Sequence, residues 1–327
     1  MTILSVLDQS PIRAGGSAGD AIHETLELAE LADRLGYHRY WLAEHHNSAG
    51  LAGSAPEILI GQVAARTKRL RVGSGGVMLS HYSPYKVAEL FRMLETLFPG
   101  RIDMGLGRAP GSDQLTAMAL QFSDKAFSPD QYPHQLAALF AFLNDAMPAD
   151  HPFARVHAVP LGPTTPEAWL LGSSDQSGLM AAYFGCGFSF AHFITGEGGP
   201  SVMEAYRRNF RPSAALAEAR GSIGVHVICA ESEAAADRAA RSRDLWRLRN
   251  DRGIHLPVPT VEEALAYEYS PEEKARAAWH RQRQVIGDPD QCKAKLLALG
   301  QDYGVDEFVV VTVVQDYVRK FAAITDT

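Results

Sequence analysis

The residues best suited to chemistry stand in the short run Trp41–His46, WLAEHH, where a hydrophobic segment ends in a carboxylate and two imidazoles. A metal site, an acid–base group and the polar end of an ordinary strand are the three possible interpretations. Neighbouring side chains of an extended chain point to opposite sides, so His45 and His46 do not easily share a metal ion. A carboxylate beside an imidazole can fix its tautomer and raise its basicity. Glu44 therefore favours an acid–base role for the pair Glu44 and His45.

Two adjacent glycines, Gly75 and Gly76, interrupt the β-type run RVGSGGVML. Glycine weakens a strand, so the fold or the function should require the missing side chains at this point. One explanation is a bulge or bend in a barrel. The other is the close approach of a flat ligand to the backbone, and the residues alone leave both open.

Two further stretches carry groups that bind anions. The run RIDMGLGRAPGS places Arg108 just after a strand, where a guanidinium can hold a phosphate or carboxylate, or form a surface salt bridge. The run WLLGSSDQSGLMAA passes from a strand into a helix through Ser173 and Ser174, with Ser177 one turn later. Hydroxyls and free backbone N–H groups at a helix start form an anion site. Capping needs only one of these serines, so the three together with Arg108 favour a bound phosphate.

Short β-type runs alternate with helical stretches along the chain, which favours a parallel sheet with crossover helices. The eight predicted strands span 3–7, 40–43, 70–77, 102–106, 169–171, 187–191, 223–229 and 308–313. We predict an α/β fold, a single (β/α)8 TIM barrel domain over residues 1–327, with a surface excursion at 148–167 after the fourth strand and a helical insertion at 250–285 before the eighth. An open doubly wound sheet is the alternative, but residues 8–19 lack its Gly-x-Gly-x-x-Gly turn.

In a (β/α)8 barrel the functional site lies at the carboxyl ends of the strands. His45 and Arg108 both directly follow predicted strands. We therefore expect these side chains to meet at one mouth of the barrel.

Composition limits the class of protein, because 46% hydrophobic and 21% charged residues with a net charge of −7 are typical of a globular chain. The basic residues at 238–252 are interspersed with acidic ones on a predicted helix, so we expect no nucleic-acid binding. Cys186, Cys229 and Cys292 lack Cys-x-x-Cys spacing, which argues against a disulfide framework and a zinc site. No apolar run reaches the roughly eighteen residues of a membrane span. With no signal-peptide pattern at the amino terminus, we expect a cytoplasmic protein.

Taken together, these stretches resemble the bacterial luciferase-like monooxygenases, a superfamily of flavin-dependent (β/α)8 barrels. The resemblance lies in GYHRYWLAEHH, in the run 71–113, in WLLGSSDQSGLMAA and in the late IGDPDQCKAKL. It implies FMN as the cofactor, with the phosphate near Arg108, Ser173, Ser174 and Ser177.

The resemblance also implies roles for the residues of the first two stretches. His45 stands beside the flavin ring and handles protons, and Glu44 is its neighbour. The Gly75–Gly76 peptide corresponds to a bond that is commonly cis in the family and lies against the ring.

The activity that the resemblance implies is that of a two-component monooxygenase. Reduced FMN arrives from a separate NAD(P)H-dependent flavin reductase, forms a flavin 4a-hydroperoxide with O₂ and oxygenates a small organic substrate. The luciferases carry a cysteine where this chain has Gly107, so we expect weak or no light emission. A deazaflavin-dependent hydride-transfer enzyme and a non-catalytic flavin-binding protein are the alternatives. Homodimers are common among such proteins, and a homodimer is expected here.

Overall fold

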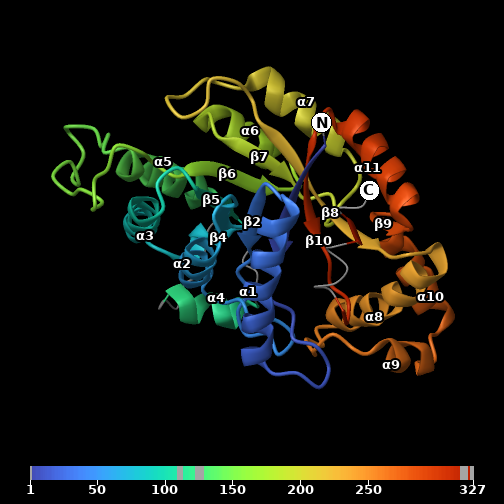
Figure 1. Ribbon diagram of the computed structural model, residues 1–327. Coiled ribbons are helices and arrows are strands. Elements are labelled where there is room, and N and C mark those ends of the chain that lie inside the picture. The colour runs from blue at the N-terminus through green and yellow to red at the C-terminus, as the bar shows by residue number, and fades with distance from the viewer. Residues whose placement is uncertain (1, 109–112, 122–128, 317–322, 325–327) are drawn as a thin grey trace.

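Eight parallel strands close into a barrel at the centre of the chain (Figure 1). The computed structural model describes residues 2–108, 113–121, 129–316 and 323–324. The barrel strands are β1 (Ile3–Asp8), β2 (Arg39–Leu42), β3 (Arg71–Ser74), β5 (Ile102–Gly107), β6 (Glu167–Gly172), β7 (Gly187–Phe190), β8 (Gly221–Cys229) and β10 (Glu307–Val311). Strand β10 pairs with both β1 and β8, which closes the ring. The predicted TIM barrel is confirmed, and the open doubly wound sheet is wrong because its sheet would have two free edges.

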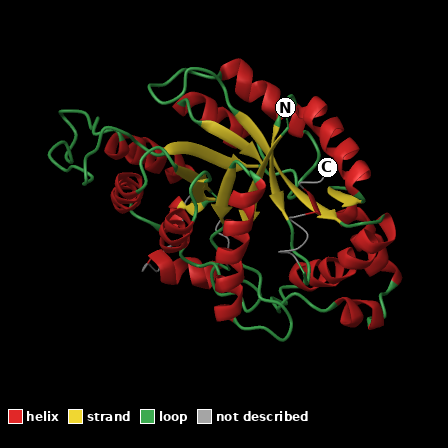
Figure 2. Cartoon of the chain, in the orientation of Figure 1, coloured by secondary structure: helices red, strands yellow, loops and turns green. Residues whose placement is uncertain are grey.

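Helices surround the barrel and bury its outer face (Figure 2). They are α1 (Ala18–Leu35), α2 (Pro56–Arg66), α3 (Pro84–Leu97), α5 (Tyr132–Leu143), α6 (Asp175–Phe184), α7 (Gly199–Asn209), α8 (Glu233–Asp251) and α11 (Pro289–Tyr303). Helix α1 illustrates why they form: Ser17 and Asp20 make a reciprocal capping box at its start, and Gly36 ends it with a φ of 84°. In the described part of the chain, no helix combines the length and apolar character that a membrane span needs.

The third predicted strand is interrupted at its two glycines. The sequence predicts one strand over 70–77, whereas the structure has β3, then the Gly75–Gly76 peptide, then β4 (Val77–Met78). The Gly75–Gly76 peptide bond is cis, as the family resemblance implied. Strand β4 pairs with β5, so the chain rejoins the sheet immediately after the break.

Two segments depart from the simple alternation of strand and helix. The excursion between β5 and β6 contains α4 (Gln114–Gln121), a short 3-10 turn (Pro129–Gln131), α5 and the irregular stretch 144–166. The insertion between β8 and β10 contains α9 (Val261–Ala266), α10 (Pro271–Arg281) and β9 (Gln284–Gly287). Strand β9 was not predicted, and it pairs with the last four residues of β8. Helices α8, α9 and α10 lie together at the end toward which the strand arrows point (Figures 1 and 2).

A buried arginine ties four strands together at the opposite, amino-terminal end of the barrel. The guanidinium of Arg39 on β2 contacts Asp103 on β5 at 2.7 Å, Glu307 on β10 at 2.8 Å and Glu167 on β6 at 3.1 Å. Burial opposes the charge of Arg39, but these carboxylates raise its pKa above the ordinary value. The guanidinium also lies 4.7 Å from the centre of the Trp169 ring. Because the three acids are far apart in sequence, this cluster fixes strands that local interactions cannot fix.

We expect Arg39→Met to lower the free energy of unfolding by about 3–5 kcal/mol, because the variant leaves buried carboxylates without their cation. Chemical denaturation followed by circular dichroism measures the change. The matched control is Arg66→Met, which removes an arginine whose side chain is 46% exposed and lies 3.8 Å from Glu30. This exposed pair should contribute less than about 1 kcal/mol. Equal losses in the two variants would contradict the role of Arg39.

Candidate functional site

The carboxyl ends of four neighbouring strands bring the predicted site residues to one mouth of the barrel. Strands β2, β3, β5 and β6 are consecutive in the sheet, and β4 continues beside β5. The predicted residues follow these strands in the same order: Glu44 and His45, then Gly75 and Gly76, then Arg108, then Ser173, Ser174 and Ser177. The mouth therefore holds every candidate that the sequence singled out.

Glu44 is buried and binds three groups from the loops around it. Its carboxylate accepts the backbone N–H of Met78 at 2.9 Å, the hydroxyl of Tyr82 at 2.6 Å and Nε2–H of His46 at 2.7 Å. Burial and the bond to Glu44 raise the pKa of Tyr82. The expectation that Glu44 orients His45 is wrong, because the carboxylate binds His46, two residues on, instead. Glu44 thus holds the loop after β2 against the loop after β4.

His45 is left with an unpaired ring nitrogen. Its ring is half-buried, and its Nδ1 is buried with no hydrogen-bond partner among the residues that the structure describes. Burial, and to a smaller extent the charge of neighbouring His46, lowers the pKa of His45 to about 4. The ring is therefore neutral at pH 7, with one N–H and one lone pair. A polar atom of this kind, buried and unpaired, is a place where a ligand is expected to bind.

The two glycines are required by the packing of the barrel itself. A Cβ atom on Gly75 would lie 2.3 Å from Cδ1 of Leu7, and one on Gly76 would lie 2.7 Å from the carbonyl oxygen of Gly105. Of the two explanations open from the sequence, a tight bend in the barrel accounts for both residues. The absence of side chains also leaves the backbone bare beside the residues that follow β2 and β5.

Arg108 meets the amino-terminal turn of α6, as an anion site requires. Its guanidinium donates to the side chain of Gln176, two residues after the N-cap Ser174. The Ser174 hydroxyl accepts the backbone N–H of Ser177 and lies 3.1 Å from the Ser177 hydroxyl. A positive side chain, a pair of hydroxyls and the positive end of a helix dipole thus converge on one spot. Arg108 thus contacts the first turn of α6, which also carries Ser177 and is capped by Ser174, and Ser173 directly precedes this cap.

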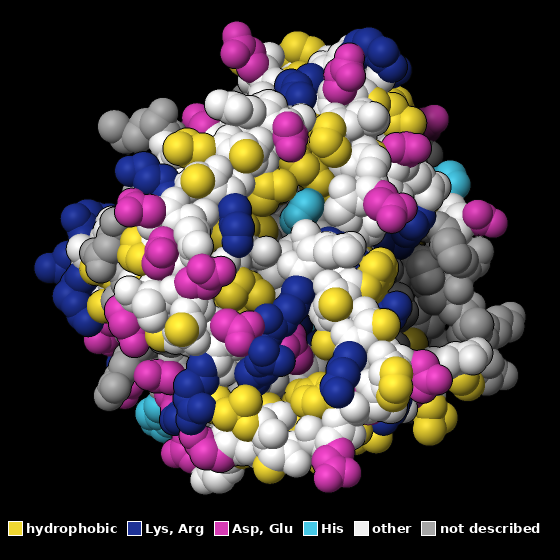
Figure 3. Space-filling view, turned by 90° about the vertical axis from the view of Figure 1, so that its right-hand side faces the viewer, with side chains coloured by type: hydrophobic (Ala, Val, Ile, Leu, Met, Phe, Trp, Pro, Cys, Tyr) yellow, Lys and Arg dark blue, Asp and Glu magenta, His cyan; other side chains and the backbone are white. Residues whose placement is uncertain are grey.

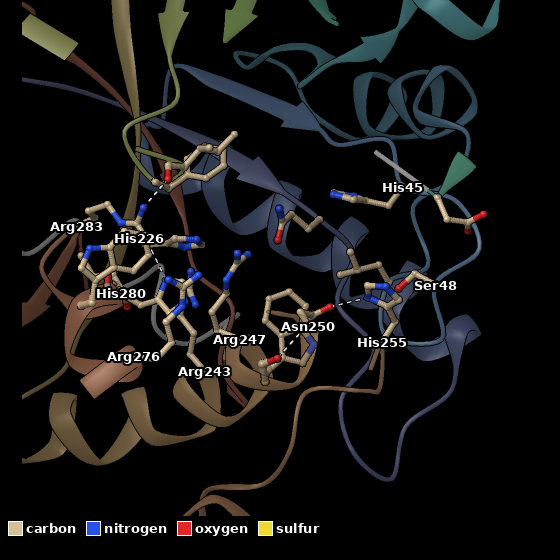
Figure 4. Close-up of a pocket in the computed structure, with 18 of the residues that line it drawn as sticks. His45, Ser48, His226, Arg243, Arg247, Asn250, His255, Arg276, His280 and Arg283 are labelled. Carbon is tan, nitrogen blue, oxygen red and sulfur yellow. Dashed lines mark hydrogen bonds between the residues drawn. The ribbon is translucent and has the colours of Figure 1, made fainter. Parts of the chain in front are cut away.

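A cavity of about 770 Å³ opens beside His45. It lies between the loop after β2 on one side and α8, α10 and β9 on the other (Figure 4). Among the described residues, His45 is the one predicted site residue that lines it. His45 thus belongs both to the predicted site and to the lining of this cavity.

The far wall of the cavity was missed by the sequence analysis. The basic and aromatic residues on it are His226, Arg243, Trp246, Arg247, Arg276, Trp279, His280 and Arg283. Residues 243, 247 and 250 recur at intervals of four and three, so they share one face of α8. This spacing was the available signal, but the acidic residues between the arginines suggested an ordinary solvated helix. In the described part of the chain, no three His, Cys, Asp or Glu side chains gather as metal ligands.

Comparison with known proteins agrees with this geometry. The family model described as luciferase-like monooxygenase matches residues 2–307. An N-acetyl-S-alkylcysteine monooxygenase of Bacillus subtilis is 38% identical, over 98% of this chain and 95% of that protein, and a luciferase-like monooxygenase of Escherichia coli K12 is 39% identical, over 94% and 90%. The crystal structure of apo-MsnO8 is 37% identical, with a TM-score of 0.92 over 100% of this chain and 98% of that one. The chain belongs to the luciferase-like monooxygenase family.

Proposed function

We propose that this protein is an FMN-dependent monooxygenase that receives reduced FMN from a separate NAD(P)H-dependent flavin reductase and oxygenates a small organic molecule. The observation that carries the proposal is the meeting of Arg108 with the first turn of α6. The expected homodimer and cytoplasmic location stay predictions.

The residues at the mouth fit the parts of FMN. Arg108, Ser174 and Ser177, with the backbone N–H groups of α6, would hold the phosphate. The bare backbone of Gly75 and Gly76 would take the flat ring. The unpaired Nδ1 of His45 is the polar atom available to the ring or to the substrate beside it.

When bound, reduced FMN would supply the two electrons that let one oxygen atom of O₂ enter the substrate while the other leaves as water. The chain itself binds, orients and excludes water. His45 is neutral at pH 7, so one ring nitrogen can accept a proton from the reacting groups and the other can donate one. Glu44, held by Met78, Tyr82 and His46, positions the loop that carries His45.

We expect Arg108→Met to weaken FMN binding by about tenfold or more, because a charge-assisted bond to a phosphate is lost. Riboflavin, which lacks the phosphate, should bind the wild type and the variant equally. Fluorescence titration with both flavins measures this, with Arg155→Met on the exposed excursion as the control. Equal loss of FMN and riboflavin binding would place the phosphate elsewhere. Binding of a deazaflavin in preference to FMN would support the hydride-transfer alternative instead.

We expect His45→Ala to lower turnover by about 10²-fold or more while FMN affinity changes little, because the proton-handling group is lost and the phosphate grip is kept. The control is His23→Ala, which lies exposed on α1. Because the pKa of His45 is lowered to about 4, the ring does not become protonated until the pH falls well below the ordinary pKa of histidine. Wild-type turnover should therefore show no loss from His45 between about pH 8 and pH 5. Unchanged activity in His45→Ala would remove this residue from the mechanism.

Incorporation of labelled oxygen tests the reaction itself. A relative named N-acetyl-S-alkylcysteine monooxygenase shares 38% identity, so N-acetyl-S-methylcysteine is the first substrate to try. With a flavin reductase, NADH, FMN and ¹⁸O₂, mass spectrometry should find one ¹⁸O atom in the product. Oxygen consumption without labelled product from any compound of a broad panel would favour a flavin-binding protein without oxygenase activity.

A further inference from the structure

The wall of the cavity opposite His45 carries an excess of positive charge. Four arginines line the cavity: Arg243, Arg247, Arg276 and Arg283. In the described part of the chain the one carboxylate on the lining belongs to Asp113, which Asn47 and Thr116 already bind. On the face that carries α8 and α10, Figure 3 shows basic side chains gathered near the middle, with acidic ones beside them. This local excess occurs in a chain whose net charge is −7.

Arg243 is the least satisfied of these side chains. It is only 5% exposed, and its Nε and Nη1 are buried without a hydrogen-bond partner among the described residues. Burial, and then repulsion from Arg247, lowers the pKa of Arg243 to about 9, so the side chain is still charged at pH 7. A buried cation without an acceptor is costly, so the fold should hold Arg243 here for an acceptor that arrives from outside.

The neighbouring arginines have some partners and keep other donors free. Arg247 binds Asp251 at 2.8 Å, and Arg283 donates to His280 at 2.8 Å. Nevertheless the Nε atoms of both Arg247 and Arg283 are buried and unpaired in the described structure. Asp251 serves Arg247, Arg276 and His280 together, so its single charge does not neutralise the group.

The arginines are held in place by groups that do not consume their free donors. Arg276 and Arg283 lie over the Trp279 ring, at 4.4 and 3.9 Å from its centre. Cation–π contact fixes a guanidinium while leaving its edge available for hydrogen bonds. Trp246 donates to the carbonyl oxygen of Leu256, so its ring is also fixed on the cavity wall. Aromatic surface next to unpaired guanidinium edges suits an organic acid: a carbon chain with an anionic end.

We propose that this cavity binds the anionic end of the substrate, a carboxylate or sulfonate, through Arg243, Arg247 and Arg283. Figure 4 shows these arginines on one side of the cavity and His45 on the other. An organic acid whose anionic end is bound by these arginines therefore extends its carbon chain toward His45. The inference rests on the proposed function for what happens at that far end, but the binding of the anion does not depend on it.

Calorimetric titration of the full chain, saturated with FMN, tests the proposal with three probes of one length: hexanoate, pentane-1-sulfonate and neutral hexanamide. Both anions should bind and hexanamide should bind at least about tenfold more weakly. Arg243→Met should weaken binding of the anions by about tenfold or more and leave hexanamide unchanged. The control is Arg238→Met, which removes a 57% exposed arginine of the same helix that pairs with Glu262.

If Arg243→Met does not fold, Arg283→Met gives the same comparison from the other side of the cavity. Equal binding of hexanoate and hexanamide, or anion binding that both arginine variants leave intact, would overturn the proposal. Inorganic phosphate that binds as tightly as hexanoate would also overturn it, since the site would then recognise a free anion rather than a substrate. Absence of ¹⁸O in the product of every compound tested, with anion binding at Arg243 retained, would instead refute the proposed function and leave this inference standing.

Discussion

The barrel depends on the ion pairs that the buried guanidinium of Arg39 makes with three carboxylates. Its acceptors come from Asp103, Glu167 and Glu307, so one side chain joins β2 to β5, β6 and β10. A charge taken out of water is tolerated only when its partners are placed accurately, and this requirement makes the amino-terminal end of the barrel rigid. The opposite mouth carries irregular loops. Because the strands that bear these loops are fixed relative to one another, the loop side chains keep their positions.

The two sides of the mouth present different chemical groups. The ends of β3, β5 and β6 present bare backbone, hydroxyls and Arg108, whereas α8, α10 and β9 present guanidinium groups and indole rings. His45 lines the cavity and is half-buried, and its Nδ1 has no partner among the residues that the structure describes. The carboxylate of its neighbour Glu44 binds Met78, Tyr82 and His46 and so holds loops together. Two adjacent residues thus differ, because the carboxylate of Glu44 binds neighbouring loops whereas Nδ1 of His45 has no partner among the described residues.

Much of the fold could be predicted from the sequence because strand and helix patterns are local. The ends of the strands followed from the same patterns, so Arg108 and Ser174 could be expected at one mouth. The partner of Glu44 was predicted wrongly, because adjacency in the sequence does not show which of the two imidazoles turns toward the carboxylate. The basic far wall of the cavity was also missed. It combines one face of α8 with residues next to β9, a strand that was not predicted and that pairs with β8.

The insertion before the last strand and the earlier part of the chain contribute separate parts of the candidate site. Residues 243–284 form one continuous stretch, and they supply most of the wall that faces His45, while the residues proposed to hold the flavin lie before residue 178. Substitutions within this single stretch would alter the lining of the cavity and leave unchanged the residues that follow β3, β5 and β6.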